Sequence, residues 1–226
     1  RILDAWIEQG APYAKHWAFT TPKRESPPTE VFQQQVNTPW APETRSRWTE
    51  HPIDAFVAQR LMETNLSPSP PADPATLLRR AALTLTGMLP PQGLQERYLA
   101  NPTDEAYAAA VDELLSSMAY AERQSLRWLD ASRYADTDGY QNDAGRTNWP
   151  YRDWVTQAFY ENMPFDQFTI LQIAGDMLPD ATDSQRLATA FNRNHRQNAE
   201  GGALAEEFFV ENVIDRVETT ATVWLG

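Results

Sequence analysis

The segment Asp73-Pro-Ala-Thr-Leu-Leu-Arg-Arg-Ala-Ala-Leu-Thr-Leu-Thr-Gly87 carries the clearest helical pattern in the sequence. Asp73 is a favourable N-cap residue, and the proline that follows suits the first turn of a helix. Apolar residues recur at helical spacing along one stripe: Leu77, Leu78, Ala81 and Leu85. Gly87 is the type of residue that ends a helix. The stretch therefore predicts an amphipathic helix with one buried face.

The same periodicity recurs over most of the chain. We expect further helices from about residue 52 to 61, and over residues 91–99, 104–115, 120–133, 150–159, 165–174, 184–191 and 203–220. Neither a sustained period-two alternation nor an Asn-Gly hairpin signal is found. The predicted fold class is mainly α: an irregular multi-helix domain with long loops, preceded by an extended Pro-rich N-terminal connector.

The first fifty residues have a different pattern. Ile2, Leu3, Trp6 and Ile7 recur at helical spacing, without a capping residue before them, which indicates the last turns of a helix. Residues 11–50 are rich in Pro, Thr, Gln and Glu, so we expect an extended connector there. We expect three aromatic side chains to pin it: Trp17, Phe19 and Trp40. The apolar finish at residues 223–226, like this start, suggests a segment of a larger protein.

Composition limits the function. The 226 residues carry a formal net charge of -12 and contain no cysteine. This acidity argues against a nucleic-acid-binding face, because a broad basic patch is needed to displace phosphate counterions. The lack of cysteine excludes disulfides, thiolate metal sites and thioether-attached haem within these residues. No apolar run is long enough to span a membrane, and no signal peptide is recognisable.

A first polar loop, Arg133–Arg146, contains three aspartates between two aromatic-rich helices. Asp136, Asp138 and Asp143 offer oxygen ligands of the kind that calcium prefers, although their spacing is not that of an EF-hand. Alternatively, Asp136 and Asp138 form the acid–base pair of a glycosidase, with a neighbouring aromatic ring stacked on sugar. A third interpretation is that the aspartates simply form turns.

A second polar loop, residues 192–202, contains His195, one of only three histidines. A histidine on such a loop suits a metal or haem ligand, a proton shuttle or an ordinary surface position. Met163 and Met177 flank the loops and are candidate soft axial ligands. In the acidic helix that follows, the pattern predicts a solvated charged face and a buried apolar one. The residues expected on the buried face are Phe208, Phe209, Val213 and Val217.

Several motifs in order resemble a known family: the domain of unknown function found beside planctomycete-type cytochrome c modules. They include His16-Trp-Ala-Phe19, Pro52-Ile-Asp54, Leu85-Thr-Gly87, Arg133-Tyr-Ala-Asp-Thr-Asp-Gly-Tyr140, Tyr151-Arg-Asp-Trp-Val155, Met163-Pro-Phe-Asp166, Ala174-Gly-Asp176, Phe191-Asn-Arg-Asn194, Glu200-Gly-Gly202 and Asp215-Arg-Val-Glu-Thr-Thr220. By this resemblance, residues 1–15 are the C-terminal helix of a preceding cytochrome c-like module and 16–50 the connector. Residues 51–226 are the helical cytochrome-associated domain, truncated at its C-terminal end.

The resemblance implies an exported, periplasmic, multidomain c-type cytochrome, whose haem c is attached by a Cys-x-x-Cys-His site beyond Gly226. Its partners would be the neighbouring cytochrome c and C-terminal domains of the same polypeptide, and a redox partner protein. The domain would support electron transfer by shielding the haem. The residues expected near the haem are His195, Arg193, Asn194 and Arg152. A polysaccharide-acting enzyme that uses the Asp136–Asp143 loop, and a calcium-stabilised structural module, remain alternatives.

Overall fold

The computed structural model describes residues 1–29, 40–140, 142–198, 201–202 and 204–226. Over these residues all regular elements are helices, and the sole β-type pairing is an isolated bridge between Thr137 and Gly145. The predicted mainly α class is confirmed. The chain forms two compact units, Arg1–Pro71 and Ala72–Gly226, and each is described by itself.

The first unit contains α1 (Ile2–Glu8), the short 3₁₀ helix η1 (Trp17–Phe19), α3 (Pro42–Glu50) and α4 (Pro52–Glu63). Its small core joins Trp40 to Ala55 and Ala58 of α4, with Trp48 of α3 packed alongside. The indole nitrogen of Trp40 donates a hydrogen bond to the Leu66 carbonyl (3.1 Å). Trp40 therefore anchors this part of the chain, as expected.

Two expectations for the connector were wrong. Residues 42–50 are helical rather than extended, because Pro42 is pre-organised for a first helical turn and Trp48 packs edge-on against Trp40. Trp17 and Phe19 are exposed and pin nothing within the described residues. Residues 30–39 of the predicted connector lie outside the described residues.

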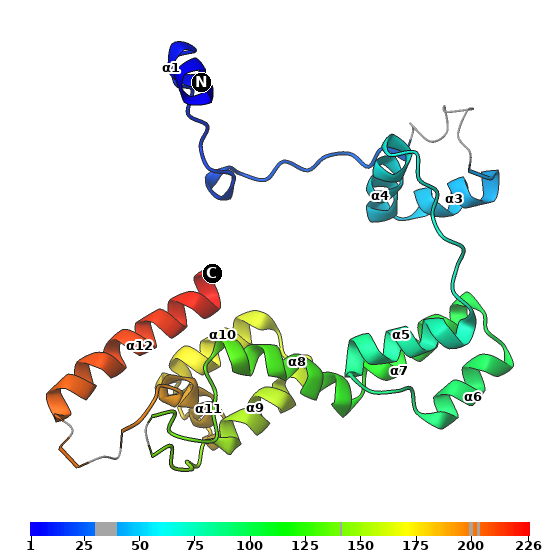
Figure 1. The fold of residues 1–226 in the computed structure, drawn as a ribbon. Coiled ribbons are helices and arrows are strands. Elements are labelled where there is room, and N and C mark those ends of the chain that lie inside the picture. The colour runs from blue at the N-terminus through cyan, green and yellow to red at the C-terminus, as the bar shows by residue number, and fades with distance from the viewer. Residues whose placement is uncertain (30–39, 141, 199–200, 203) are drawn as a thin grey trace. The chain divides into compact units, whose positions relative to one another are not determined.

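The second unit begins with α5 (Pro74–Thr86), α6 (Gln92–Ala100) and α7 (Asp104–Leu115) (Figure 1). The helix predicted from residues 73–87 is confirmed: the Asp73 carboxylate accepts the Thr76 amide hydrogen (3.0 Å), and Gly87 ends α5 with a φ of 72°. The apolar stripe of α5 contributes to a common core of buried residues: Leu78, Ala82, Leu94, Tyr98, Ala110 and Leu114.

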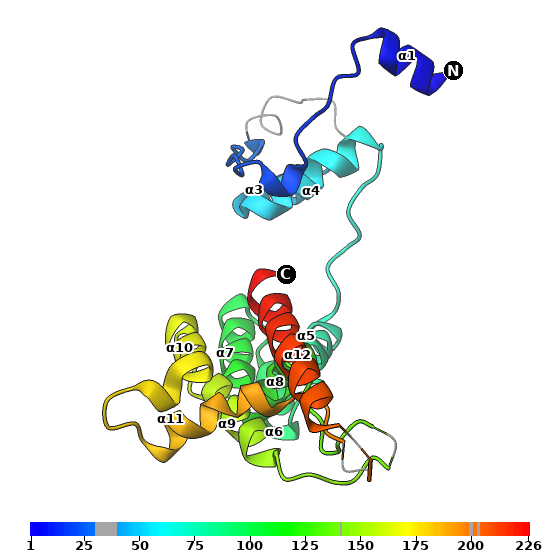
Figure 2. The ribbon, with the colours of Figure 1, turned by 90° about the vertical axis from the view of Figure 1, so that its left-hand side faces the viewer.

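The rest of this unit is a second helical group (Figures 1 and 2). It comprises α8 (Met118–Ala131), α9 (Trp149–Tyr160), α10 (Phe165–Ala174), η2 (Gly175–Met177), α11 (Asp183–Ala188), η3 (Thr189–Arg193) and α12 (Ala205–Leu225). Aromatic residues dominate its core, where Phe168 contacts Trp128, Trp154 and Phe159. Among the described helices, none is long and apolar enough to cross a membrane.

Most predicted helices of the second unit agree with the structure to within two residues at each end, and the last two differ more. The segment expected as one helix over residues 184–191 is α11 followed by the tighter turn η3. The start of η2 lies very close to α11: a Cβ atom added to Gly175 would be 2.2 Å from the Gln185 carbonyl oxygen. The last helix runs from Ala205 to Leu225, five residues past the expected end at residue 220. Its expected start, Ala203, lies outside the described residues.

Candidate functional site

The two polar loops singled out in the sequence lie against each other. The Arg146 guanidinium donates to the carbonyl oxygens of His195 (2.7 Å), Asn194 (3.2 Å) and Ala135 (3.3 Å). The Gln197 amide donates to the Asp138 carbonyl (3.0 Å). We call this contact region, formed by residues 133–148 and 192–198 without the undescribed Gln141, the loop junction.

The first loop folds back on itself before it meets the second. Arg133 turns the chain out of α8 with a left-handed backbone (φ 58°). The Asp138 amide then donates to the Ala144 carbonyl (2.9 Å), and the Arg146 amide to the Asp136 carbonyl (2.9 Å). These backbone bonds, with the bridge between Thr137 and Gly145, give the loop a fixed shape without a sheet.

The loop junction contains a buried pair of side-chain amides. The Asn148 amide nitrogen donates to the Asn194 side-chain oxygen (2.7 Å), and Asn194 is only 4% exposed. Asn148 is only 8% exposed, so both amides are shielded from water. Buried polar groups depend on such pairing, because an unmade hydrogen bond in a buried position costs free energy.

A second set of hydrogen-bonded polar side chains lies in the helical core next to this amide pair. The Tyr151 hydroxyl, which is fully buried, donates to the Gln172 side-chain oxygen (2.7 Å), and the Trp128 indole nitrogen donates to the same oxygen (2.9 Å). Burial raises the pKa of Tyr151 to about 12. Tyr151 is therefore a neutral hydrogen-bonding residue at physiological pH.

His195 is held by the backbone of its own loop. Its Nδ1 lies 3.3 Å from the Asn192 carbonyl oxygen, which also accepts a hydrogen bond from Arg216 of α12 (3.0 Å). Burial lowers the pKa of His195, and the nearby Arg216 charge lowers it further. Because a carbonyl oxygen only accepts, we assign the hydrogen of the neutral ring to Nδ1, which leaves the Nε2 lone pair available.

Two of the three aspartates of the first loop, Asp136 and Asp143, have separate local side-chain contacts. Asp136 accepts a hydrogen bond from the Tyr134 hydroxyl (2.5 Å). The pKa of Tyr134 is raised to about 12, mainly by burial and next by this hydrogen bond. Asp143 accepts from the Gly139 amide (2.8 Å), and hydrogen bonds from Thr137 and Gly139 lower the pKa of Asp143.

Asp138 is buried at the junction. In the described part of the chain, no group of three or more acidic or histidine side chains is arranged to hold a metal ion. The contact of Asp143 with the Gly139 amide is that of a turn-forming aspartate, whereas the Asp136 carboxylate contacts the side chains of Tyr134 and Arg152. The calcium and glycosidase interpretations remain untested predictions.

The structure separates the residues that were expected near a haem. Arg193, Asn194 and His195 all belong to the second loop of the junction, but only Asn194 and His195 are turned inward, whereas Arg193 is exposed at the end of η3. Arg152 pairs with Asp153 (3.0 Å), lies 3.9 Å from Asp136 and lines a groove between α8 and α9. Arg152 therefore reaches only the Asp136 side of the first loop.

Sequence reasoning missed the residues that join the loops. Arg146 and Asn148 have no local pattern that marks them, because their partners are 46 to 49 positions away in the chain. Two further arginines tie the junction to α12: Arg133 pairs with Asp215, and Arg196 pairs with Glu211 while lying over the Tyr140 ring. A small open hollow of about 190 Å³ lies here, and its charged lining residues are Arg133, Asp138, Arg146, Arg196 and Asp215.

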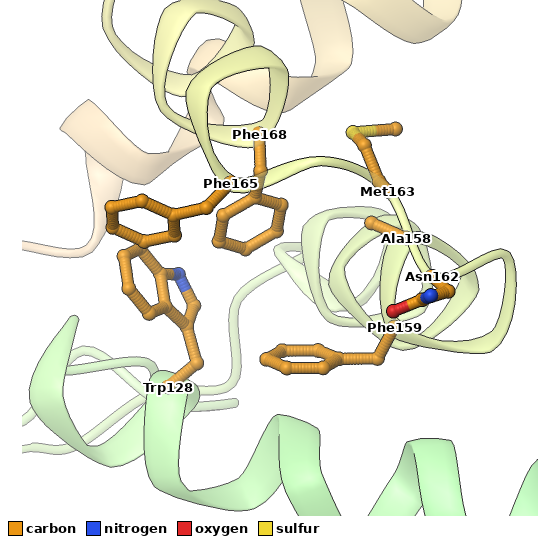
Figure 3. A pocket seen from close by; sticks show the side chains of 7 residues that line it. All are labelled: Trp128, Ala158, Phe159, Asn162, Met163, Phe165 and Phe168. Atoms are coloured by element: carbon orange, nitrogen blue, oxygen red, sulfur yellow. The ribbon is translucent and has the colours of Figure 1, made fainter. Parts of the chain in front are cut away.

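A second, apolar hollow of about 330 Å³ lies between α8, α9 and the start of α10 (Figure 3). Phe159 faces Trp128, Phe165 and Phe168 across it, and Met163 lies near its rim. Met177, the other candidate soft ligand, is 80% exposed on η2. Of the two methionines, only Met163 borders this hollow.

The orientation of α12 corrects the prediction for its buried face. Phe209, Val213 and Val217 were expected inside, but all three are exposed. The face that contacts the unit includes Asp215, the buried Thr219 and Trp224. The ion pair of Arg133 with Asp215 and the Trp224 hydrogen bond to Thr169 (3.1 Å) fix this orientation, and the sequence pattern of α12 alone contains neither partner.

Comparison with protein families gives one match. Residues 52–226 match the model of PSCyt2, described as a protein of unknown function (DUF1549). The chain belongs to the PSCyt2 family. No curated protein and no solved structure matches it. The PSCyt2 match covers α4 to α12 and so includes the loop junction, the apolar hollow and the outward apolar side of α12.

Proposed function

We propose that this PSCyt2 domain supports haem-based electron transfer within an exported, multidomain c-type cytochrome, and that His195 is its haem ligand or haem-edge residue. The order of motifs that resembles the cytochrome-associated family supports this proposal, and the short name PSCyt2 is in keeping with a cytochrome context. When bound, a haem supplies a one-electron redox couple. The domain contributes no thioether attachment, because the 226 residues contain no cysteine.

The anchored His195 ring carries the proposal. A metal-binding histidine needs a neutral ring, and its second nitrogen commonly donates to a carbonyl or carboxylate that fixes the tautomer. The contact of Nδ1 with the Asn192 carbonyl meets this requirement, and the lowered pKa of His195 keeps the ring neutral at physiological pH. Arg216 and Arg146 hold the surrounding backbone, so the ring has a defined position.

The distance along α12 is compatible with a haem attached beyond Gly226. Arg216, which contacts the His195 loop, precedes Gly226 by ten residues, or about 15 Å of helix. An extended chain covers that distance in about five residues. A segment of about five residues that continued past α12 and folded back along it would be long enough to reach the loop junction.

The test is an optical and potentiometric comparison of the full-length parent polypeptide with its His195→Ala variant. We expect the variant to change the low-spin α-band, or to shift the midpoint potential of one haem if His195 only borders it. Met163→Leu tests the alternative ligand at the apolar hollow, and Gln157→Ala, on the exposed surface of α9, serves as the control.

Each result has a distinct meaning. A spectrum and potential that respond only to Met163→Leu would transfer the haem contact from His195 to the apolar hollow. Identical spectra and potentials in both variants would overturn contact between the haem and either residue. A parent polypeptide without haem would overturn the proposed function altogether.

A further inference from the structure

The outermost helix of the second unit presents its apolar side to solvent. Phe209 and Val217 of α12 are 68% and 64% exposed, and Val210, Val213 and Ile214 between them are also exposed. Their spacing of three, four and seven residues places them on one side of the helix. We call these five residues the outer face. A surface helix ordinarily buries such a stripe, so α12 has the reverse arrangement.

The inner side of α12 is already occupied, so a simple rotation cannot bury the outer face without breaking contacts. Asp215 pairs with Arg133, Arg216 donates to the Asn192 carbonyl (3.0 Å), and Glu211 pairs with Arg196. Trp224 packs edge-on against Trp128 (5.4 Å) and Phe191 (4.9 Å) near the end of the helix. These contacts hold the outer face outward along most of its length.

The charge around the outer face indicates what covers it. Within α12 there are five acidic residues and one basic residue. Glu206 and Glu207 are exposed at its N-terminal end, and Glu218 is 3.9 Å from Arg133. Asp215 and Glu211 are paired with Arg133 and Arg196, so the rim of the outer face is acidic mainly through Glu206, Glu207 and the more distant Glu218.

A second copy of the chain matches this surface poorly. Each copy carries a net charge of -12, so long-range repulsion opposes the association of two copies. An antiparallel two-fold contact also places the glutamates of both copies along the same edge, because such an interface repeats one patch on both sides. A complementary partner instead has an apolar stripe flanked by lysine or arginine.

We propose that the outer face of α12 is a docking site for a helical protein segment with an apolar stripe and a basic rim. This inference does not depend on haem and is independent of the function proposed above. Apolar burial against Phe209, Val213 and Val217 would supply affinity, and the acidic rim would select the basic partner over acidic ones.

The test uses the 226-residue chain and two fluorescent helical peptides of about 20 residues. Both have the same leucine stripe, but one is flanked by lysine and the other by glutamate. At about 0.15 M salt, which screens distant charges, we expect the lysine peptide to bind at least about tenfold more tightly than the glutamate peptide, a difference of about 1.4 kcal/mol.

Two variants separate docking from general attraction to an acidic protein. Val213→Asp adds a negative charge to the outer face, and we expect it to weaken binding of the lysine peptide about tenfold or more. Ile170→Asp adds the same charge to an exposed apolar position on α10, and we expect no loss. Replacing Glu207 and Glu218 by lysine is expected to reverse the preference between the two peptides.

The proposal would be overturned if the lysine peptide failed to bind, or if both peptides bound equally well. It would also be overturned if Val213→Asp and Ile170→Asp weakened binding of the lysine peptide equally. A wild-type dimer in sedimentation that becomes monomeric in Val213→Asp would assign the outer face to a second copy. Binding of the chain to phosphatidylcholine vesicles that Val213→Asp abolishes would assign it to a lipid surface.

Discussion

Phe168 on α10 and Phe209 on α12 belong to the same compact unit but have opposite environments. Phe168 is 5% exposed and contacts three aromatic rings, whereas Phe209 is among the most exposed apolar side chains of α12. The α8–α10 group is held by apolar burial, while much of α12 is held by ion pairs and hydrogen bonds. The contrast teaches that a large apolar residue indicates burial only where its own helix has an apolar partner.

The largest expected effect is on Phe168. Phe168→Ala removes the ring that contacts Trp128, Trp154 and Phe159, and we expect it to lower the free energy of unfolding by about 3–5 kcal/mol. The matched change Phe209→Ala is expected to alter the free energy of unfolding by no more than about 0.5 kcal/mol. Urea denaturation of both variants measures the difference. Comparable losses in the two variants would contradict the exposed position of Phe209.

Gly175→Ala tests the close packing behind the same core. A Cβ atom at Gly175 would lie 2.2 Å from the backbone oxygen of Gln185, so α11 must shift, and we expect a loss of about 2–3 kcal/mol. Gly93→Ala is the control, because its Cβ meets only a flexible arginine at 3.5 Å and alanine favours helix. In thermal unfolding, the midpoint temperature of Gly175→Ala should lie well below that of Gly93→Ala. Equal midpoints would refute the close contact between Gly175 and the Gln185 backbone.

Asn148→Ala tests the loop junction. The change leaves the buried Asn194 side-chain oxygen without its donor, and we expect a loss of about 1–3 kcal/mol. Gln157→Ala, which removes an exposed amide contact to Glu161 on α9, is expected to cost less than about 0.5 kcal/mol.

The Asn148→Ala/Asn194→Ala double variant sharpens this test. Its loss should be smaller than the sum of the two single losses, because removing both partners leaves no orphaned polar group. Additive losses, measured by urea denaturation, would mean that the two amides do not interact.

Local signals in the sequence predicted most of the helices of the second unit, but missed α3 in the first. The N-cap Asp73 and the terminal Gly87 marked both ends of α5, because the groups that fix those ends lie within a few residues of one another. Helix existence and helix ends of this kind are local properties of the chain.

The orientation of α12 and the partners within the loop junction could not be predicted in this way. His195 was singled out as a rare residue on a polar loop, but the arginine that holds its carbonyl is 49 positions away. The outward turn of Phe209, Val213 and Val217 depends on Arg133, which is 82 positions from Asp215. A periodic pattern shows which residues share a face, and only tertiary contacts decide which face is buried.

The smallest expected effect is the contribution of His195 to the pH dependence of stability. Burial lowers the pKa of the His195 ring in the folded state, while in the unfolded state the ring has its ordinary pKa of about 6.5. Between these two pKa values the unfolded state binds more protons, so this contribution to stability is complete above the unfolded pKa. It is lost progressively as the pH falls through the folded pKa.

His195→Gln should therefore reduce the loss of stability between about pH 7.5 and pH 5. The lowered pKa of Asp143 acts in a separate window, because its ordinary value is 3.8 and its contribution disappears only at more acidic pH. Urea denaturation at several pH values across the upper window isolates the histidine. If the wild-type protein and the variant lost stability in parallel there, the ring would be equally protonated in both states, and the burial of His195 against Asn192 and Arg216 would have no energetic consequence.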